Sequence, residues 1–370
     1  MYILMWRDIP VIAFNPEKRT GEIIHDSLIR FDKCDGSVTP YEIIENFCAS
    51  RILFMNRKYS KDILLACGID DQSPINICIV GKGLSFRDNY WIKEENSTDT
   101  WSSVNLYNNE FSHLISRVAL TGDRVQVELN DNLYTGELSN LGTRTKCIIR
   151  YKNNIILAKE ETSKEIAAEV LSSILCEKLG ILSTKYIKTT VFDRQCSVCT
   201  IATSENIEML HYRNLLHSQR SRMDFNSESY KFLMDKDYRN FIKMHIFDYI
   251  TLNTDRNRDN FALQYINGTL VGQYPLYDHD SCFKGLSTDA TYFVTNLSFR
   301  ESIKMLKENY TKRYRDVINS MQNSYMCFLK ESKDLFHDAG LDCDYEGFSY
   351  RLKECFEIGR TSIFSAVEFK

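Results

Sequence analysis

Two stretches of the sequence combine residue types that can carry out phosphoryl transfer. In TLNTDRNRDN, residues 251–260, Asp255 is followed five positions later by Asn260, and Asp278 ends the apolar run LVGQYPLYD. A carboxylate can orient an attacking hydroxyl, and carboxylate and amide oxygens are the ligands that Mg²⁺ prefers. The spacing makes Asp255 a candidate catalytic residue and makes Asn260 and Asp278 candidate metal ligands. A solvated turn is the alternative interpretation, because Asp, Asn and Arg are common in turns.

A second candidate group lies upstream. LSNLGTRTK, from Leu138 to Lys146, reads as a polar loop with one glycine between two strands, and such a loop can present backbone N–H groups and hydroxyls to phosphates. Lys159 ends the apolar strand NIILAK, and Glu169 follows on a predicted helix. Kinases hold nucleotide phosphates with a lysine that is paired to a helix glutamate. A plain hairpin and an exposed helix glutamate are the alternatives.

The elements that must position these residues begin with a sheet-rich half. Residues 1–35 predict a short hairpin, and residues 39–70 predict helices. The run from 133 to 161 predicts strands, and Thr162 and Glu165 then form a capping box at the start of a helix that ends at Gly180. Two further strand-like runs follow. We expect a small antiparallel sheet with one helix packed on it.

The second half is mostly helical. A helix over 236–252 leads into the Asp255 loop, two strands flank the Asn-Gly turn at 267–268, and amphipathic helices continue from about residue 298. A β-rich lobe followed by an α-rich lobe is the layout of a kinase. The predicted domains are an N-terminal accessory domain at 1–128, a kinase N-lobe at 129–205 and a kinase C-lobe at 206–370.

Composition and charge exclude several other classes. The chain of 370 residues has a net charge of −4, which gives no electrostatic basis for direct nucleic-acid binding. No apolar run approaches the roughly 20 residues that span a bilayer, and the N-terminus lacks the pattern of a signal peptide. We therefore expect a cytoplasmic protein with no membrane contact.

As a set, the motifs resemble those of the HipA-like kinases, toxin-type serine/threonine kinases of bacteria. The resemblance is greatest to a branch with an extra N-terminal domain, and it covers most of residues 70–290. The sequences that carry it are NYWIKEENSTDTWSSVNLYNNEF, GTRTKC, AEVLSSILCEKLGI, FDYITLNTDRNRDNFAL and YPLYDHDS.

The resemblance implies an α+β, two-lobed protein-kinase-like fold of HipA type, with an added N-terminal α/β domain. It implies that Asp255 is catalytic and that Asn260 and Asp278 hold Mg²⁺. The implied ATP-binding residues are Gly142, Thr143, Lys146, Lys159 and Glu169, with Ser204, Glu205 and Asn206 as the hinge that contacts adenine. The candidates for self-phosphorylation are Ser139, Thr143 and Thr145.

The expected function is that of an ATP- and Mg²⁺-dependent protein serine/threonine kinase, acting on a protein that the sequence does not identify. A nucleotide-binding pseudokinase and a scaffold that acts through protein contacts are the alternatives. The family often has a small DNA-binding antitoxin as a partner. Two positions depart from the family pattern: Asn257 replaces the usual His, and Asp280 stands where Gly is common. Asp280 is either a further metal ligand or a solvated turn residue.

Overall fold

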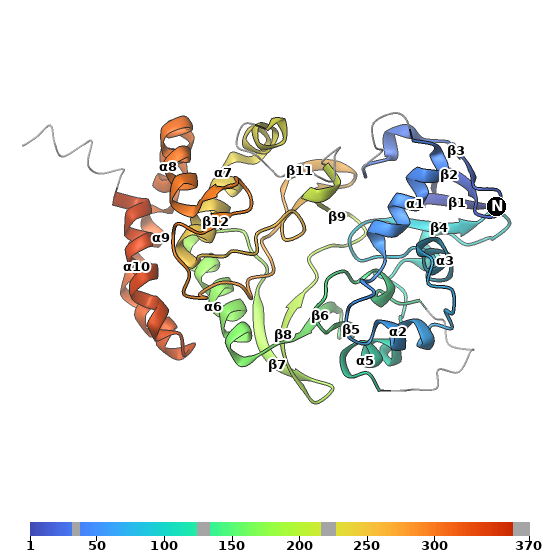
Figure 1. Cartoon of the computed structure of the whole chain (residues 1–370), viewed down its shortest axis with the longest axis horizontal. Coiled ribbons are helices and arrows are strands. Elements are labelled where there is room, and N and C mark those ends of the chain that lie inside the picture. The colour runs from blue at the N-terminus through green and yellow to red at the C-terminus, as the bar shows by residue number, and fades with distance from the viewer. Residues whose placement is uncertain (32–37, 124–133, 216–226, 358–370) are drawn as a thin grey trace, which may run out of the picture.

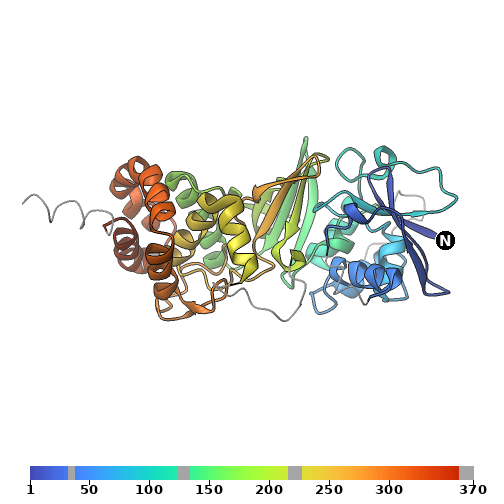
Figure 2. The same cartoon turned by 90° about the horizontal axis from the view of Figure 1, so that it is seen from above.

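The computed structural model of the chain describes residues 1–31, 38–123, 134–215 and 227–357. Two perpendicular views show an elongated molecule, with the N-terminal sheet at one end, a second sheet in the middle and long helices at the other end (Figures 1 and 2). The predicted boundary between residues 128 and 129 lies outside the described residues, so the domain division stays a prediction. Within the described ranges, no helix is both long and apolar enough to cross a membrane.

The N-terminal part, residues 1–123, is built on an antiparallel sheet in the order β3-β2-β1-β4. Its strands are β1 (Tyr2–Trp6), β2 (Ile9–Asn15), β3 (Thr20–Ile23) and β4 (Tyr90–Glu94). Its helices are the 3₁₀ turn η1 (Asp26–Leu28), α1 (Pro40–Arg51), α2 (Ser60–Ala66), α3 (Pro74–Val80), α4 (Trp101–Val104) and α5 (His113–Thr121). The predicted hairpin and the helices after it are confirmed. A capping box between Thr39 and Glu42 begins α1.

The second sheet has the antiparallel order β5-β6-β8-β7. Its elements are β5 (Lys146–Tyr151), β6 (Asn154–Glu160), α6 (Ser163–Leu179), β7 (Tyr186–Val191) and β8 (Arg194–Thr200). The capping box of Thr162 and Glu165 starts α6, and Gly180 ends it with φ 65°, a left-handed conformation that glycine adopts without strain. The predicted sheet with one helix packed on it is confirmed.

One predicted strand is absent. The residues at the start of the predicted phosphate loop form the 3₁₀ helix η2 (Glu137–Ser139) and are not preceded by a strand. The cause is the burial of the Glu137 carboxylate, which accepts a hydrogen bond from the backbone N–H of Ile148 at 2.5 Å and lies 3.5 Å from Arg57. A buried carboxylate needs such partners, and the backbone turns to supply them.

The N-terminal part and the second sheet share one hydrophobic core. Residues of the second sheet and of η2 belong to the same buried cluster as the cores of β1, β2 and α1. These residues are Leu138, Cys147, Ala158, Cys196 and Val198. The N-terminal part is therefore packed directly against the region that carries Lys159.

The C-terminal part continues with a three-stranded antiparallel sheet in the order β11-β10-β9 and with a helical bundle. Its strands are β9 (Ile207–His211), β10 (Ala262–Ile266), β11 (Thr269–Gln273), β12 (Thr291–Tyr292) and β13 (Leu297–Ser298). Its helices are η3 (Tyr212–Leu215), α7 (Glu228–Thr251), α8 (Phe299–Asn309), α9 (Thr311–Asp338) and α10 (Asp342–Glu357).

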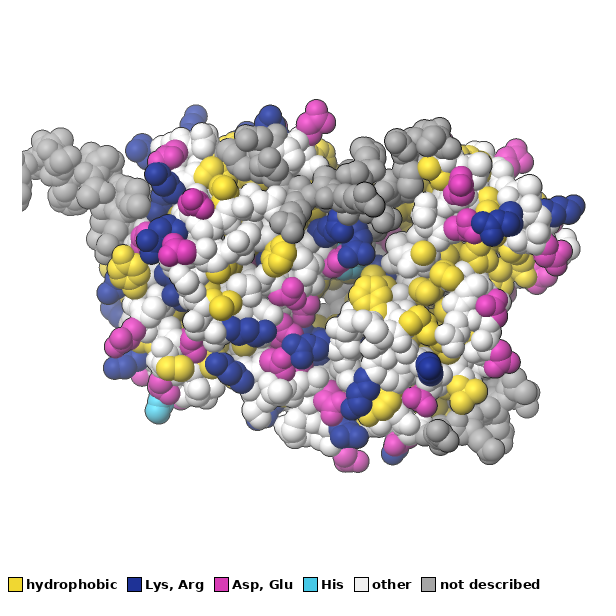
Figure 3. Space-filling model, viewed as in Figure 1, with side chains coloured by type: hydrophobic (Ala, Val, Ile, Leu, Met, Phe, Trp, Pro, Cys, Tyr) yellow, Lys and Arg dark blue, Asp and Glu magenta, His cyan; other side chains and the backbone are white. Residues whose placement is uncertain are grey.

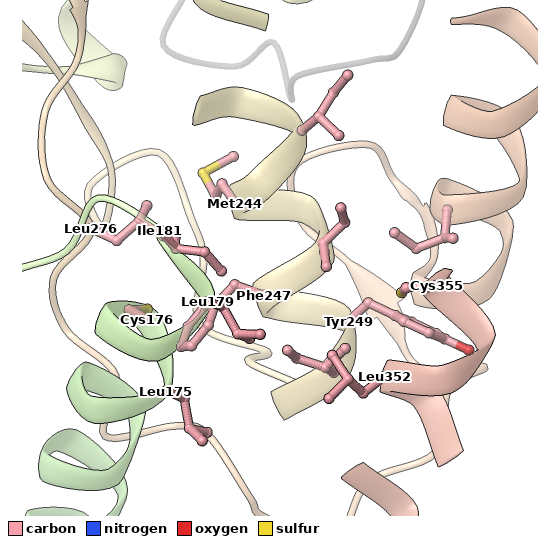
Figure 4. Packing of buried hydrophobic residues seen from close by; sticks show 14 of the residues in the cluster. Leu175, Cys176, Leu179, Ile181, Met244, Phe247, Tyr249, Leu276, Leu352 and Cys355 are labelled. Carbon is pink, nitrogen blue, oxygen red and sulfur yellow. The ribbon is translucent and has the colours of Figure 1, made fainter. Parts of the chain in front are cut away.

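A second large core joins α6 to this bundle. Figure 4 shows apolar side chains of α6, α7 and α10 meeting in one cluster, including Leu175, Leu179, Phe247, Tyr249 and Leu352. Because α7 ends at Thr251, this packing fixes the point from which the loop of Asp255 leaves the helix.

Candidate active site

A cavity of about 700 Å³ lies where the three parts of the chain meet. Its lining includes Phe54, Phe86 and Arg87 from the N-terminal part, Leu157 and Lys159 from β6, and Asp255, Asn260 and Asp278 from the C-terminal part. Basic and acidic side chains gather along the boundary between the two halves of the molecule (Figure 3). A volume of this order suits a small-molecule or cofactor site.

Lys159, at the end of β6, is buried among three carboxylates. Its ammonium group pairs with Glu169 on α6, lies 3.0 Å from Asp278 and lies 3.3 Å from Glu161. Burial opposes the charge of Lys159, but these carboxylates outweigh it and hold the pKa of the lysine well above its ordinary value. The structure thus brings the predicted pair Lys159–Glu169 together and adds Asp278 and Glu161 to it.

A buried arginine, Arg256, holds the loop of Asp255 in place. Arg256 pairs with Asp248 of α7 at 3.2 Å and donates to the carbonyls of Asn260 at 2.5 Å and Tyr277 at 2.8 Å. Since Tyr277 immediately precedes Asp278, this one side chain ties the loop to the end of the strand segment. The two candidate stretches of the sequence therefore lie side by side.

Two amides hold the Asp255 carboxylate. The side-chain Nδ2 of Asn260 donates to Oδ2 of Asp255 at 2.9 Å, and Nδ2 of Asn257 donates to Oδ1 at 2.9 Å. Asn257 therefore supplies one of the two side-chain hydrogen bonds to the Asp255 carboxylate. Burial, together with the charges of Asp278 and Asp280, raises the pKa of Asp255 above its ordinary value.

Asp278 has a strained backbone and a strongly charged neighbourhood. Its φ is 61°, in the left-handed region, and its N–H donates to the hydroxyl of Tyr186 at 3.1 Å. Burial alone would raise the pKa of Asp278, but the charges of Lys159 and Lys146 outweigh burial and hold the pKa below its ordinary value. The carboxylate is therefore ionised at neutral pH.

The predicted phosphate loop closes one end of the cavity. Gly142 has φ 99°, and a Cβ at this position would lie 2.7 Å from Nζ of Lys146, so a larger residue would push the lysine away. Burial and the charge of Arg57 lower the pKa of Lys146 to about 8. Of the loop hydroxyls, that of Ser139 is buried and donates to the carbonyl of Gly136 at 3.2 Å, whereas Thr143 is exposed.

Asp280 is paired with the phosphate loop. Its carboxylate lies 3.2 Å from Arg144, which also contacts Glu165 at the start of α6 at 2.5 Å. Asp280 is only 6% exposed, so it is not a solvated turn residue. Arg144 thereby links the phosphate loop, α6 and the segment after Asp278. Thr145 lies between Arg144 and Lys146 and is half-buried.

The residues predicted as the hinge lie outside the cavity lining. Ser204, Glu205 and Asn206 are not among the residues that line the cavity, whereas Thr200 to Thr203 are. The reason is a tight turn in which the backbone N–H of Ser204 bonds the carbonyl of Ile207 at 3.0 Å. This turn directs the Glu205 carbonyl toward the N-terminal part, where Asn89 donates to it at 2.9 Å.

Glu161, Phe86 and Arg87 are among the site residues that the sequence did not reveal. Glu161 lies two positions after Lys159, and the charged run KEE was the available signal. Phe86 and Arg87 lie within GKGLSFRDNYW, and no local pattern connects them with the cavity residues of the second sheet and of the C-terminal part.

No protein-family model matches the chain, and no curated protein matches it in sequence. A solved structure of Shewanella oneidensis MR-1 HipA, in complex with HipB and its operator DNA, is 13% identical with a TM-score of 0.56, covering 96% of this chain and 99% of that chain. The Helicobacter pylori proinflammatory kinase CtkA is 14% identical with a TM-score of 0.43, covering 58% of this chain and 95% of that chain. The likeness to HipA extends over nearly the whole chain. This protein therefore has an α+β fold of HipA type, with its two four-stranded sheets within residues 2–200 and the helices α7 to α10 after them.

Proposed function

We propose that the chain is an ATP- and Mg²⁺-dependent protein serine/threonine kinase of HipA-like type. The observation that carries this proposal is the position of Lys159, which joins β6, α6 and the segment after β11 through Glu169 and Asp278. Asp255 and Asn260 line the same cavity. A lysine that pairs with a helix glutamate beside a separate metal-binding aspartate is the arrangement that phosphoryl transfer uses in kinases.

The cavity is lined by both apolar and basic side chains, which suits a nucleotide. The lining includes apolar side chains that can enclose a base, namely Phe86, Ile148, Leu157, Ile201 and Ala202. It also includes Lys146 and Lys159, which supply positive charge for phosphates. Close approach of a phosphate to the backbone is supported by Gly142, where a side chain would meet Lys146.

The donor set fits Mg²⁺. The side-chain nitrogen of Asn260 donates a hydrogen bond to Asp255, so the side-chain oxygen of Asn260 is the atom available to a cation. Asp278 supplies an ionised carboxylate. Mg²⁺ is usually held by one or two protein groups together with water and substrate phosphates. The ion would neutralise charge that develops on the transferred phosphoryl group.

In this reaction Asp255 orients the acceptor. The serine or threonine oxygen attacks the γ-phosphorus of ATP, the bond from that phosphorus to the β–γ bridging oxygen breaks, and ADP leaves. The proton of the hydroxyl passes to the Asp255 carboxylate, which Asn257 and Asn260 hold in place. Lys159 and Lys146 bind the phosphates and do not take part in the proton transfer.

The experiment has two stages. Binding of Mg–ATP is first measured by calorimetry, and transfer of labelled γ-phosphate to proteins of a bacterial lysate is then followed by electrophoresis. A kinase binds and transfers; a pseudokinase binds and does not transfer; a scaffold does neither.

Two finer properties are part of the proposal. The similar HipA was solved with HipB and DNA, so we propose a small DNA-binding antitoxin as a partner, which co-purification with the product of the neighbouring gene would test. We also propose self-phosphorylation in the phosphate loop. Thr143 is the exposed candidate, whereas Ser139 must first be released from its bond to Gly136. Mass spectrometry after incubation with Mg–ATP would locate the phosphate.

A further inference from the structure

One group of cationic side chains lines the cavity from the predicted phosphate loop and β6. In this group Lys159 is paired with Glu169, and Arg144 is paired with Asp280. Two further cationic side chains line the same cavity, Arg87 of the N-terminal part and Arg213 after β9. Burial and the positive charges of Arg87, Arg213 and Lys146 lower the pKa of His211 to about 3, so it is neutral.

Within the described part of the chain, no carboxylate forms an ion pair with the guanidinium group of Arg87. Its backbone carbonyl accepts from the N–H of Met209 at 2.6 Å, and its side chain donates to Ser85 Oγ and to the carbonyl of Arg51, both at 3.3 Å. The neighbouring Asp88 is occupied by Arg51 at 2.6 Å. Burial lowers the pKa of Arg87 to about 10, which leaves the side chain charged at neutral pH. A desolvated charge of this kind is costly until an anion meets it.

Arg213 places the second charge beside the loop of Asp255. Its guanidinium pairs with Asp259, which immediately precedes Asn260, and its backbone N–H donates to the carbonyl of Arg258 at 3.0 Å. Its Nε is buried and has no hydrogen-bond acceptor within the described part of the chain. Arg213 therefore has one unused hydrogen-bond donor, and it contacts the loop that carries Asp255, the residue that would orient the acceptor hydroxyl.

The geometry points to an anion subsite formed by Arg87 and Arg213, which binds an acidic side chain of the acceptor protein close to the serine or threonine that is phosphorylated. This assignment rests on the proposed kinase function, because it names a subsite for the acceptor of that reaction. Guanidinium groups suit carboxylates, since they donate planar, charge-assisted hydrogen bonds. The proposed subsite also gives the N-terminal part a role in the reaction, because Arg87 belongs to that part.

The first experiment needs no catalysis. Inorganic sulfate is titrated into the full chain with saturating Mg–ADP, which fills the phosphate end, and the melting temperature is followed. Sulfate should stabilise the wild type, and Arg87→Gln and Arg213→Gln should each lose at least half of the shift. Arg239→Gln is the matched control, because Arg239 is an exposed arginine that also pairs with one aspartate, Asp316, at 3.0 Å. Equal shifts in all four proteins would overturn the subsite.

The second experiment tests whether the anion that binds to Arg87 and Arg213 belongs to the acceptor protein. Serine peptides with Asp or Lys at each neighbouring position are phosphorylated with Mg–ATP. The wild type should favour Asp at one position by about tenfold, the worth of one charge-assisted hydrogen bond, and Arg87→Gln should lose this preference without a change in the KM for ATP. Arg87→Glu should favour Lys.

Three outcomes distinguish a failure of the acceptor subsite from a failure of the proposed kinase function. Transfer without any acidic preference in the wild type would overturn the acceptor assignment. A change in the KM for ATP in Arg87→Gln would assign the anion to the nucleotide and would also overturn it. Sulfate binding that depends on Arg87, in a protein that transfers no phosphate, would refute the kinase function and the acceptor role while leaving the anion site itself in place.

Discussion

Glu169 and His279 meet at one hydrogen bond: the backbone N–H of His279 donates to Oε2 of Glu169 at 2.8 Å, while Oε1 of the same carboxylate pairs with Lys159. Because His279 follows Asp278, one side chain of α6 positions both Lys159 and the segment that carries Asp278. In the proposed kinase, the position of α6 therefore decides whether both groups are in place.

Replacement of Glu169 by Gln should destabilise the protein and slow transfer. The amide keeps the shape of the side chain but replaces one of the two oxygens that accept from Lys159 and from the N–H of His279, and the loss of a hydrogen bond to a charged group costs about 2 kcal/mol. Urea unfolding measures this cost. Glu177→Gln is the control on the same helix; its exposed pair with Lys185 should contribute less than about 1 kcal/mol. Equal effects of the two substitutions would contradict the role of Glu169.

Asp278→Asn should abolish the stabilisation that Mg–ATP gives. Ligand at about 100 times its Kd stabilises the folded protein by about 2.7 kcal/mol, and this gain should appear in the melting temperature of the wild type. Asn tolerates the left-handed backbone at this position, so the fold should persist. Asp193→Asn is the matched control, since Asp193 has the same φ of 61° in an exposed turn. A full Mg–ATP shift in Asp278→Asn would show that the metal ligand is misassigned.

Nucleotide affinity should fall as pH rises through about 8. The free protein holds Lys146 with a pKa of about 8, so the lysine is mostly charged at about pH 7 and about one-tenth charged at about pH 9. The charged form binds phosphate, and the Kd for Mg–ATP should therefore rise about tenfold over this interval. Lys146→Arg should bind with little pH dependence, because arginine stays charged. A Kd that rises equally in both proteins would remove Lys146 as the cause.

Glu208→Ala should loosen the contact between β9 and the N-terminal part. The buried carboxylate of Glu208 accepts from Trp6 Nε1 at 2.9 Å and from the Asn89 N–H at 3.1 Å, and it pairs with Arg30 at 2.9 Å. Removing one partner of a buried pair costs about 3 kcal/mol. In Glu205→Ala, the control, only a solvent-exposed hydrogen bond to Asn108 is lost, and unfolding should change by less than about 1 kcal/mol.

Local signals in the sequence predicted much of the fold. The hydroxyl of Thr162 and the carboxylate of Glu165 cap α6 through contacts three residues apart, and Gly180 ends the helix by its own conformation. The turn at Asn267 and Gly268 joins β10 to β11, and it also depends on local conformation, because both residues have positive φ. Such features depend on neighbouring residues alone, so a single sequence is enough to predict them.

Features that depend on distant contacts were not predictable. In place of the strand expected before the phosphate loop, a 3₁₀ helix stands at the start of the loop because Glu137 is buried against Arg57, 80 residues away. Ser204–Asn206 lie outside the cavity lining because they form a tight turn in which the Glu205 carbonyl accepts a hydrogen bond from Asn89, 116 residues away. No pattern within either segment encodes these partners.

The central claim is that Asp255 orients an acceptor hydroxyl for transfer of the γ-phosphoryl group. The most direct measurement compares wild type and Asp255→Asn for transfer of labelled γ-phosphate from Mg–ATP to lysate proteins, with calorimetric ATP binding on the same preparations. Both proteins should bind Mg–ATP with similar Kd, and the variant should transfer phosphate about 10² to 10⁴ times more slowly, which is the usual contribution of a general base. Equal labelling by the two proteins, or no labelling by a wild type that binds Mg–ATP, would contradict this claim.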